Sequence, residues 1–312
     1  MRKSVSALVL ALIAVAAAAS GRAQTPAVAI AARIEKSSCS GVPEFKPTLN
    51  GKPAPVRAKL GPASDQVILI VFDLTGDLSR IEDAKQAVIT EISKLPPNAW
   101  VGVLRAQDGL HVLADPSPNR QKVIAIIRSL TSNGTPGLLE TLRPALSLAD
   151  AMIRKSPVRV SLLYITDGSV YNYREDYTDP VINPSDPHDL SRRFPDVLIN
   201  EKISKLERHI GSLEAPLFVV HLDYRQGGLD QAYQNGLETL ADTTGGEAAV
   251  CHSLSEVPQV ISTMFSRIST TWRLNLEVPP RTHNHMQVGL SASCGSDDLQ
   301  LSWRTHFQLK GE

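Results

Sequence analysis

Three continuous apolar runs, separated by segments with helical periodicity, organise most of this chain. The runs are VILIVF, VSLLYI and LFVVHL, at residues 67–72, 160–165 and 217–222. Runs of this kind predict strands that helices cover on both faces. Three intervening segments carry apolar residues three or four positions apart, which predicts amphipathic helices. Their stripes are Ile81, Ala84, Val88, Ile92 and Leu95; Leu139, Leu142, Leu146, Ala149 and Ile153; and Ile199, Ile203, Leu206, Ile210 and Leu213.

A different pattern interrupts this alternation at residues 100–115, WVGVLRAQDGLHVLAD. Two short strands meet there at Asp108-Gly109, a dipeptide that favours a hairpin turn. The hairpin predicts one antiparallel edge strand on an otherwise parallel sheet. Strands that alternate with helices predict a doubly wound α/β fold with right-handed crossovers. Ser79 and Glu82 form a capping-box pair, which predicts that the first helix begins near Ser79.

Both ends of the chain are predicted to carry small antiparallel β extensions. Before the first apolar run, FKPTLNGKPAPVRAKL predicts two short strands around Asn50-Gly51. At the other end, apolar and polar positions alternate, which predicts three half-buried strands that the N-terminal hairpin can join. These strands are carried by Trp272 to Val278, Met286 to Ala292 and Leu299 to Phe307.

The first 23 residues have the pattern of a secretory signal peptide. Arg2 and Lys3 precede an apolar stretch from Ala7 to Ala19, and small residues offer a cleavage site before Gln24. The stretch is too short for a stable membrane span, and no second long one follows. We therefore expect an exported mature chain, periplasmic or extracellular, without stable membrane insertion. The predicted units are a signal peptide over 1–23, an extension over 24–66, a central domain over 67–270 and a second extension over 271–312.

Charge and cysteine content narrow the classes of function. The 32 basic and 32 acidic side chains cancel, which argues against nucleic acid or an anionic membrane as the main partner. Cys39, Cys251 and Cys294 allow one disulfide with an odd thiol left over, or three unpaired thiols. The chain lacks the GxSxG, HExxH, P-loop and GxGxxG motifs of common enzyme sites.

Acidic and hydroxyl side chains follow the predicted strands. Asp73, Thr75 and Asp77 come at the end of the first run, Thr135 lies in the loop SNGTPG, and Asp167 follows the second run. Ligands of such sheets bind beyond the carboxyl ends of the strands. We therefore expect these side chains to lie together at that end of the sheet, which we call the rim. Gathered carboxylates repel each other unless a cation joins them, and oxygen ligands suit Mg²⁺, Ca²⁺ or Mn²⁺. The alternative is that Asp73 and Asp167 only cap the following helices.

The order DxTxD, NGT and ITDG resembles a von Willebrand factor type A domain, and LADTTGG resembles a late turn of that family. The resemblance extends from about Val67 to Ile268. It implies a non-enzymatic binding or adhesion protein, in which a metal-ion-dependent adhesion site holds Mg²⁺ or Ca²⁺ and contacts a protein partner. The family's metal ligands fall on Asp73, Thr75, Asp77, Thr135 and Asp167. The NGK hairpin and the alternating tail also resemble the exported von Willebrand A-related proteins of acidobacteria.

Asp77 departs from the family motif, which has a second Ser at this position. Two hydroxyl ligands leave the bound ion attractive to a partner carboxylate, whereas an Asp adds negative charge. If Asp77 touches the ion, the site should favour ion retention over metal-bridged adhesion. The other possibility is that Asp77 turns outward and caps the helix that follows it.

Two other functions stay open at the level of sequence. VFDLTGDL resembles the first motif of haloacid-dehalogenase-type phosphatases, where Asp73 would be the nucleophile of a metal-dependent hydrolase. Against this, Thr75 stands where those phosphatases place a general acid, and no acidic pair like GDxxxD follows downstream. The third possibility is a degenerate, metal-free scaffold domain.

The segment 170–195 is a second candidate for binding. It is polar and rich in Pro, and it leaves the strand that ends at Asp167, so it is expected to hang over the rim. Tyr171, Tyr173, Tyr177 and Arg174 are residue types that anchor protein interfaces. We therefore predict that a protein partner binds here; the alternative is an insertion without a partner.

Overall fold

A six-stranded mixed sheet forms the centre of the protein in the computed structural model, which describes residues 27–36, 41–169, 196–279 and 284–309. The strand order is β10-β9-β8-β5-β6-β7, with β7 antiparallel to β6 and the other neighbours parallel. The position of β7 confirms the antiparallel edge strand predicted from the Asp108-Gly109 hairpin. The strands are β5 Gln66–Asp73, β6 Ala99–Arg105, β7 His111–Ser117, β8 Arg159–Thr166, β9 Leu217–His221 and β10 Glu247–Val250.

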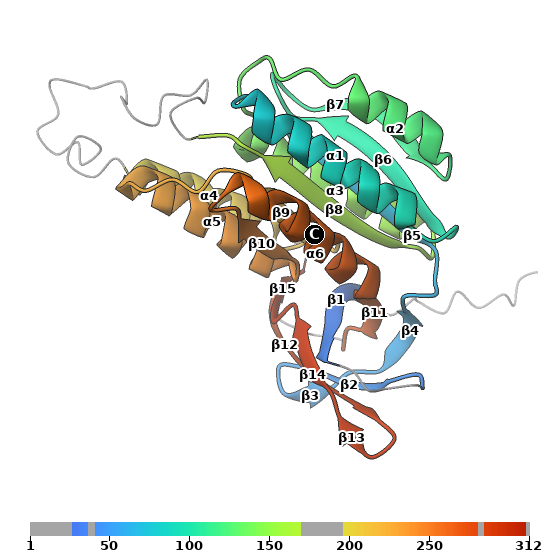
Figure 1. Ribbon diagram of the computed structural model, residues 1–312. Helices are drawn as coiled ribbons and strands as arrows, with labels where there is room; N and C mark the ends of the chain where they lie inside the picture. The colour runs from blue at the N-terminus through green and yellow to red at the C-terminus, as the bar shows by residue number, and fades with distance from the viewer. Residues whose placement is uncertain (1–26, 37–40, 170–195, 280–283, 310–312) are drawn as a thin grey trace, which may run out of the picture.

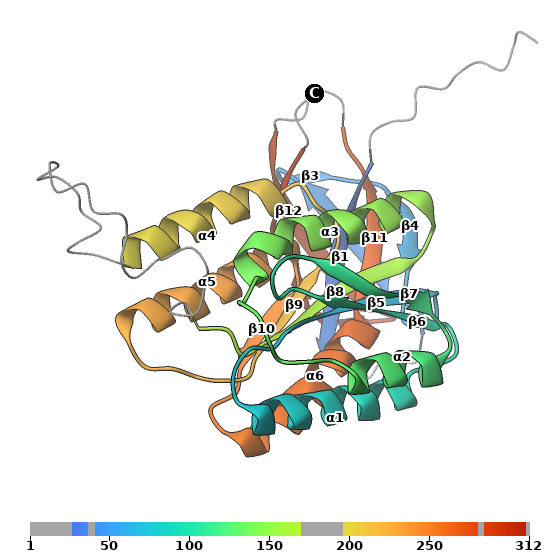
Figure 2. The ribbon, with the colours of Figure 1, turned by 90° about the horizontal axis from the view of Figure 1, so that it is seen from above.

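Helices cover both faces of this sheet, as Figure 2 shows. One face packs against α1, α2 and α6, and the other against α3, α4 and α5. Val88, Leu146 and Ile203 of the predicted stripes are buried in these interfaces. The doubly wound α/β fold is therefore confirmed. The helices are α1 Leu78–Lys94, α2 Arg120–Arg128, α3 Leu138–Lys155, α4 Asp196–Ile210, α5 Gly228–Thr244 and α6 Val257–Thr270, with the short 3₁₀ helix η3 Leu254–Glu256 before α6.

The first helix begins close to Ser79, as predicted, but Ser79 does not cap it. α1 begins at Leu78, and the Asp77 carboxylate accepts a hydrogen bond from the Ser79 backbone N–H at 2.8 Å. Asp77 is therefore the N-cap, which confirms the alternative that Asp77 caps the helix, whereas the prediction that Ser79 caps it was wrong. Asp77 has the extended backbone typical of an N-cap, and the helical backbone begins at the next residue, Leu78.

The two ends of the chain form one small β unit, made of β1–β4 and β11–β15, which lies below the central sheet in Figure 1. β11 pairs with β1 and β4, and β12 pairs with β2, so the N-terminal and C-terminal extensions share their hydrogen bonds. Ile30, Leu274 and Val288 belong to its apolar core. The strands are β1 Ala27–Lys36, β2 Glu44–Leu49, β3 Lys52–Pro53, β4 Val56–Leu60, β11 Trp272–Glu277, β12 His285–Cys294, β13 Asp297–Asp298, β14 Gln300–Trp303 and β15 His306–Gln308.

Sequence reasoning described this β unit only in part. The Asn50-Gly51 turn is confirmed, with φ values of 50° and 75° that a tight hairpin turn of this type requires. The strand β1 was missed, because Ala is a weak strand former. The last predicted strand is in fact split: β14 pairs with β1, whereas β15 pairs with β12.

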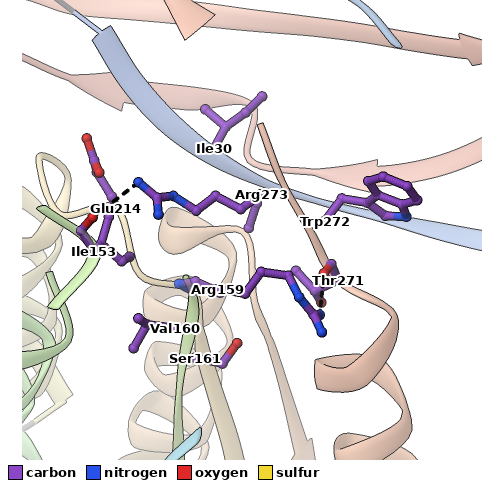
Figure 3. A pocket seen from close by; sticks show the side chains of 11 residues that line it. Ile30, Ile153, Arg159, Val160, Ser161, Glu214, Thr271, Trp272 and Arg273 are labelled. Carbon is purple, nitrogen blue, oxygen red and sulfur yellow. Dashed lines mark hydrogen bonds between the residues drawn. The ribbon is translucent and has the colours of Figure 1, made fainter. Parts of the chain in front are cut away.

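Two arginines, the buried Arg159 and the half-buried Arg273, join the β unit to the central sheet. Arg159, at the start of β8, donates to the Thr271 carbonyl at 2.9 Å. Arg273 on β11 donates to the Val158 carbonyl at 2.8 Å, and Figure 3 shows both arginines lining a small pocket at this junction. Because β8 begins at Arg159 and ends at Thr166, the pocket lies at the opposite end of the sheet from Asp73 and Asp167. The pocket therefore belongs to the junction between the β unit and the central sheet, and it is separate from the rim that carries Asp73 and Asp167.

The structure decides between the two arrangements of cysteines that the sequence allowed. Cys251 is a free, buried thiol, whereas Cys294 is disulfide-bonded, so the chain has both a disulfide and an odd thiol. Across the described ranges, no helix combines the length and the apolar character needed to cross a membrane. The predicted signal peptide at 1–23 lies outside the described residues.

Candidate metal centre

Asp73 and Asp167 lie side by side at the carboxyl end of the central sheet. β5 ends at Asp73, its parallel neighbour β8 ends at Thr166, and the ladder pairs these two residues. Asp167 follows directly, and its backbone N–H donates to the Asp73 carbonyl at 3.3 Å. The pairing of two buried parallel strands thus brings both carboxylates to one edge.

The Asp73 carboxylate is fully buried and accepts three hydrogen bonds. The N–H groups of Gly137 and Leu138, at the start of α3, donate to it at 2.9 and 3.2 Å. The Thr166 hydroxyl donates at 3.2 Å. Burial outweighs these bonds, which favour the charged form, and raises the pKa of Asp73 to about 7.

Asp167 is held by the loop that follows β5. The N–H groups of Thr75 and Gly76 donate to its two carboxylate oxygens, each at 2.6 Å, and the Thr75 hydroxyl lies 3.4 Å from Oδ1. A β-carbon on residue 76 would come within 2.8 Å of the Asp167 carboxylate, so Gly76 permits this close approach. Burial raises the pKa of Asp167, and the charge of Asp167 adds to the rise at Asp73.

The other two predicted ligands contact different groups. Asp77 is exposed and caps α1. The Thr135 hydroxyl donates to Oδ1 of Asp108 at 2.8 Å. The structure therefore brings Asp73, Thr75 and Asp167 together and places Asp77 and Thr135 on neighbouring partners.

The chemistry of the rim suits a hard cation. Its side-chain groups are oxygens, and a shared cation relieves the repulsion between two buried carboxylates. These oxygens accept backbone hydrogen bonds here, so an ion has to share them with those donors or displace some of them. In the part of the chain that the structure describes, no three His, Cys, Asp or Glu side chains gather as a metal cluster. The arrangement thus fits a site of two carboxylates completed by hydroxyls, without Asp77 as a third carboxylate.

The rim lies within a segment that matches a known family. Residues 65–169 match the von Willebrand factor type A domain family, and all five predicted ligands fall inside the match. The chain contains a von Willebrand factor type A domain. Domains of this family generally mediate protein–protein interactions and are typically not enzymes. A search of curated proteins gave no match.

Several solved structures resemble this chain at low sequence identity. A von Willebrand factor type A protein from Catenulispora acidiphila has a TM-score of 0.44 at 14% identity, over 92% of this chain and 74% of that one. The ArnB paralog VWA2 from Sulfolobus acidocaldarius has a TM-score of 0.43 at 10% identity, over 89% and 75%. The PilB minor pilin from Streptococcus sanguinis has a TM-score of 0.45 at 13% identity, over 69% and 63%.

Sequence reasoning missed several groups at the rim of this von Willebrand A domain. The amides of Gly137 and Leu138 carry no side-chain signature, although the glycines of SNGTPG before a helix signal a close backbone approach. His221, at the end of β9, is buried, and its Nε2 lies 3.0 Å from the Gly168 carbonyl. Burial lowers the pKa of His221 to about 4, so the ring is neutral and donates this hydrogen bond. A single His within the apolar run LFVVHL gave no indication that its ring bonds to the loop after β8.

The predicted partner-binding residues Tyr171, Tyr173, Tyr177 and Arg174 lie outside the described residues. Their role therefore stays a prediction. The last described residue before them is Ser169, whose hydroxyl donates to Oδ1 of Asp230 at 3.3 Å.

Replacing Asp77 with Ala is expected to lower stability and leave the affinity for divalent ions unchanged. Asp77 caps α1, and the loss of such a cap costs about 1 kcal/mol. Asp77→Ser should lose less, because a Ser hydroxyl can also cap a helix. Denaturant unfolding and calorimetric titration with Mg²⁺ measure the two effects. Weaker Mg²⁺ binding at unchanged stability would instead identify Asp77 as a ligand.

Proposed function

We propose that this protein is an exported, non-enzymatic interaction protein that binds a protein partner through a divalent ion at the Asp73–Asp167 rim. The ion is Mg²⁺ or Ca²⁺, and its protein ligands are drawn from the carboxylates of Asp73 and Asp167 and the hydroxyls of Thr75 and Thr135. The observation that carries the proposal is the meeting of two buried carboxylates at the edge where this fold binds ligands.

Charge balance supports an ion at this rim. Burial raises the pKa of both Asp73 and Asp167, which means that the doubly charged pair is costly without a cation. A divalent ion supplies the opposite charge that offsets this cost. Two carboxylates neutralise such an ion, whereas a third would make the site negative. Because Asp77 caps α1, the site remains receptive to an acidic group of a partner.

Export is supported by two independent features. The first 23 residues have the pattern of a signal peptide. Cys294 is disulfide-bonded, and structural disulfides persist mainly in oxidising compartments outside the cytoplasm. The proposed site of action is therefore the periplasm or the extracellular space.

An ion-dependent binding assay tests the proposal. The probe is a fluorescently labelled, glutamate-rich peptide, which stands in for an acidic partner. We expect the protein to raise the anisotropy of the peptide with Mg²⁺ present, and both chelator and Asp167→Ala to abolish the signal. Asp115→Ala is the matched control, because it removes the same charge from an exposed position on β7 and should bind like the unmodified protein. Equal binding with Mg²⁺ and with chelator would contradict an ion-bridged interaction.

The phosphatase alternative has weaker support. A nucleophilic Asp73 needs a lone pair directed at a phosphoryl group. Asp73 is fully buried, and both of its oxygens accept hydrogen bonds, from Gly137 and from Leu138 and Thr166. A metal-free scaffold is the remaining alternative, and in that case the partner binds without an ion.

A further inference from the structure

The turn between β6 and β7 lies against the loop that leaves β5. The Gln107 side-chain amide donates to the Leu74 carbonyl at 2.7 Å. Leu74 stands between Asp73 and Thr75, so this bond holds the loop that carries both of them. Gln107 is almost completely buried, which excludes water as a competing partner for the bond.

The next residue, Asp108, holds the second loop of the rim. Its Oδ1 accepts hydrogen bonds from the Thr135 hydroxyl at 2.8 Å and from the Thr135 N–H at 3.3 Å. The Asp108 N–H donates in return to the Thr135 carbonyl at 3.2 Å. Reciprocal bonds of this kind fix both the backbone and the hydroxyl of Thr135.

The backbone on both sides is shaped for this contact. Asp108 has a φ of 55°, in the left-handed region that Asp tolerates better than most residues. Gly134 has a φ of 112°, and a β-carbon there would come within 2.4 Å of Oδ2 of Asp108. A residue other than Gly at 134 would therefore push the loop away from the Asp108 carboxylate.

We infer that Asp108 is a positioning residue for the ion site and acts through Thr135. This inference rests on the proposed function, because it assumes a divalent ion at the rim. Asp108 accepts the hydrogen of the Thr135 hydroxyl, which leaves the lone pairs of that hydroxyl for a cation. Partners that orient metal ligands in this way affect affinity strongly without touching the ion.

Substitutions at Asp108 separate this role from two others. If Asp108 itself bound the ion, or acted only through its charge, its loss would weaken binding whether or not Thr135 had a hydroxyl. If it positions Thr135, its loss should matter only when that hydroxyl is present. Asp108→Asn keeps an oxygen that accepts from Thr135 but removes the charge, whereas Asp108→Ala removes both.

The experiment is a calorimetric Mg²⁺ titration of the unmodified protein, Asp108→Ala, Asp108→Asn, Thr135→Val and Asp108→Ala/Thr135→Val. We expect Asp108→Ala to weaken Mg²⁺ binding roughly tenfold, as the loss of such a partner does in metal sites. Asp108→Asn should retain most of the affinity. The double variant should bind like Thr135→Val alone. Asp115→Ala serves as the control for a distant change of charge.

The outcomes decide the inference separately from the proposed function. Unchanged affinity in Asp108→Ala, or an equal loss in both Thr135 backgrounds, would overturn the positioning role and leave the ion site standing. If the unmodified protein binds no Mg²⁺, the proposed function fails, and amide hydrogen exchange over residues 131–138 decides whether Asp108 holds Thr135. Faster exchange in Asp108→Ala than in Asp108→Asn supports that hold, and equal rates in all three proteins overturn it.

Discussion

Arg304→Ala is expected to destabilise the protein by about 3 to 5 kcal/mol, because the change leaves buried carbonyl groups without a donor. Arg304 lies between β14 and β15 and is 1% exposed. Its guanidinium donates to the Gly211 and Leu213 carbonyls after α4, and to the His306 carbonyl at 2.8 Å. Burial lowers the pKa of Arg304 to about 9, so the side chain is still protonated at neutral pH. Denaturant unfolding with a tertiary-structure probe measures the loss.

The matched control for Arg304 is Arg57→Ala in the same β unit. Arg57 forms an ion pair with Glu277 at 2.8 Å, but both side chains are about a third exposed. Exposed pairs of this kind contribute roughly 0 to 1 kcal/mol. Similar losses in the two variants would show that Arg304 does not join the β unit to the central domain.

The ion-free protein is expected to lose stability as the pH rises from about 4 to 7, because of Asp73. The pKa of Asp73 is about 7 in the folded protein, against 3.8 for an ordinary Asp. Between these two pKa values the folded state keeps a proton on Asp73 that the unfolded state has released. The stability that Asp73 contributes is therefore fully present below pH 3.8 and is lost as the pH rises to about 7. A shift of this size corresponds to about 4 kcal/mol. Urea unfolding over this pH range, with a chelator present, measures the change.

Asp73→Asn separates this contribution from those of other groups. The Asn side chain keeps one acceptor for the α3 amides but does not titrate. The stability of the variant should therefore vary less with pH than that of the unmodified protein. Parallel pH profiles would mean that Asp73 takes up no proton on folding. A saturating divalent ion should also reduce the pH dependence, because it replaces the proton as the charge partner of Asp73.

The central sheet could be predicted from sequence because its strands are buried on both faces. Such strands read as unbroken apolar runs, as VILIVF and VSLLYI do, and the helices between them keep a regular stripe. The β unit was harder to predict, since its register depends on pairing between distant ends of the chain. β1 contains four alanines and pairs with β11 and β14, and no local pattern in its own sequence indicates this pairing.

At the rim, sequence predicted the residues whose position follows from the strands. Asp73 and Asp167 meet because β5 and β8 are parallel neighbours, and Thr75 follows Asp73 in the same loop. The orientation of Asp77 depends on where α1 begins, and that start shifts easily when two nearby residues, here Asp77 and Ser79, can both act as caps. The hydrogen-bond partner of Thr135 is Asp108, which lies in the hairpin turn between β6 and β7. No motif in the sequence indicates that this turn contacts the rim.

Calorimetric titration of the purified, ion-free protein with Mg²⁺ and Ca²⁺ tests the central claim most directly. A single saturable site is predicted, together with the loss of that site in Asp73→Ala and in Asp167→Ala under conditions where circular dichroism shows both variants to be folded. Proton release on binding at neutral pH should accompany the site, because the ion displaces the proton of Asp73. No binding by the unmodified protein, or unchanged binding by both folded variants, would contradict a divalent-ion site at the Asp73–Asp167 rim.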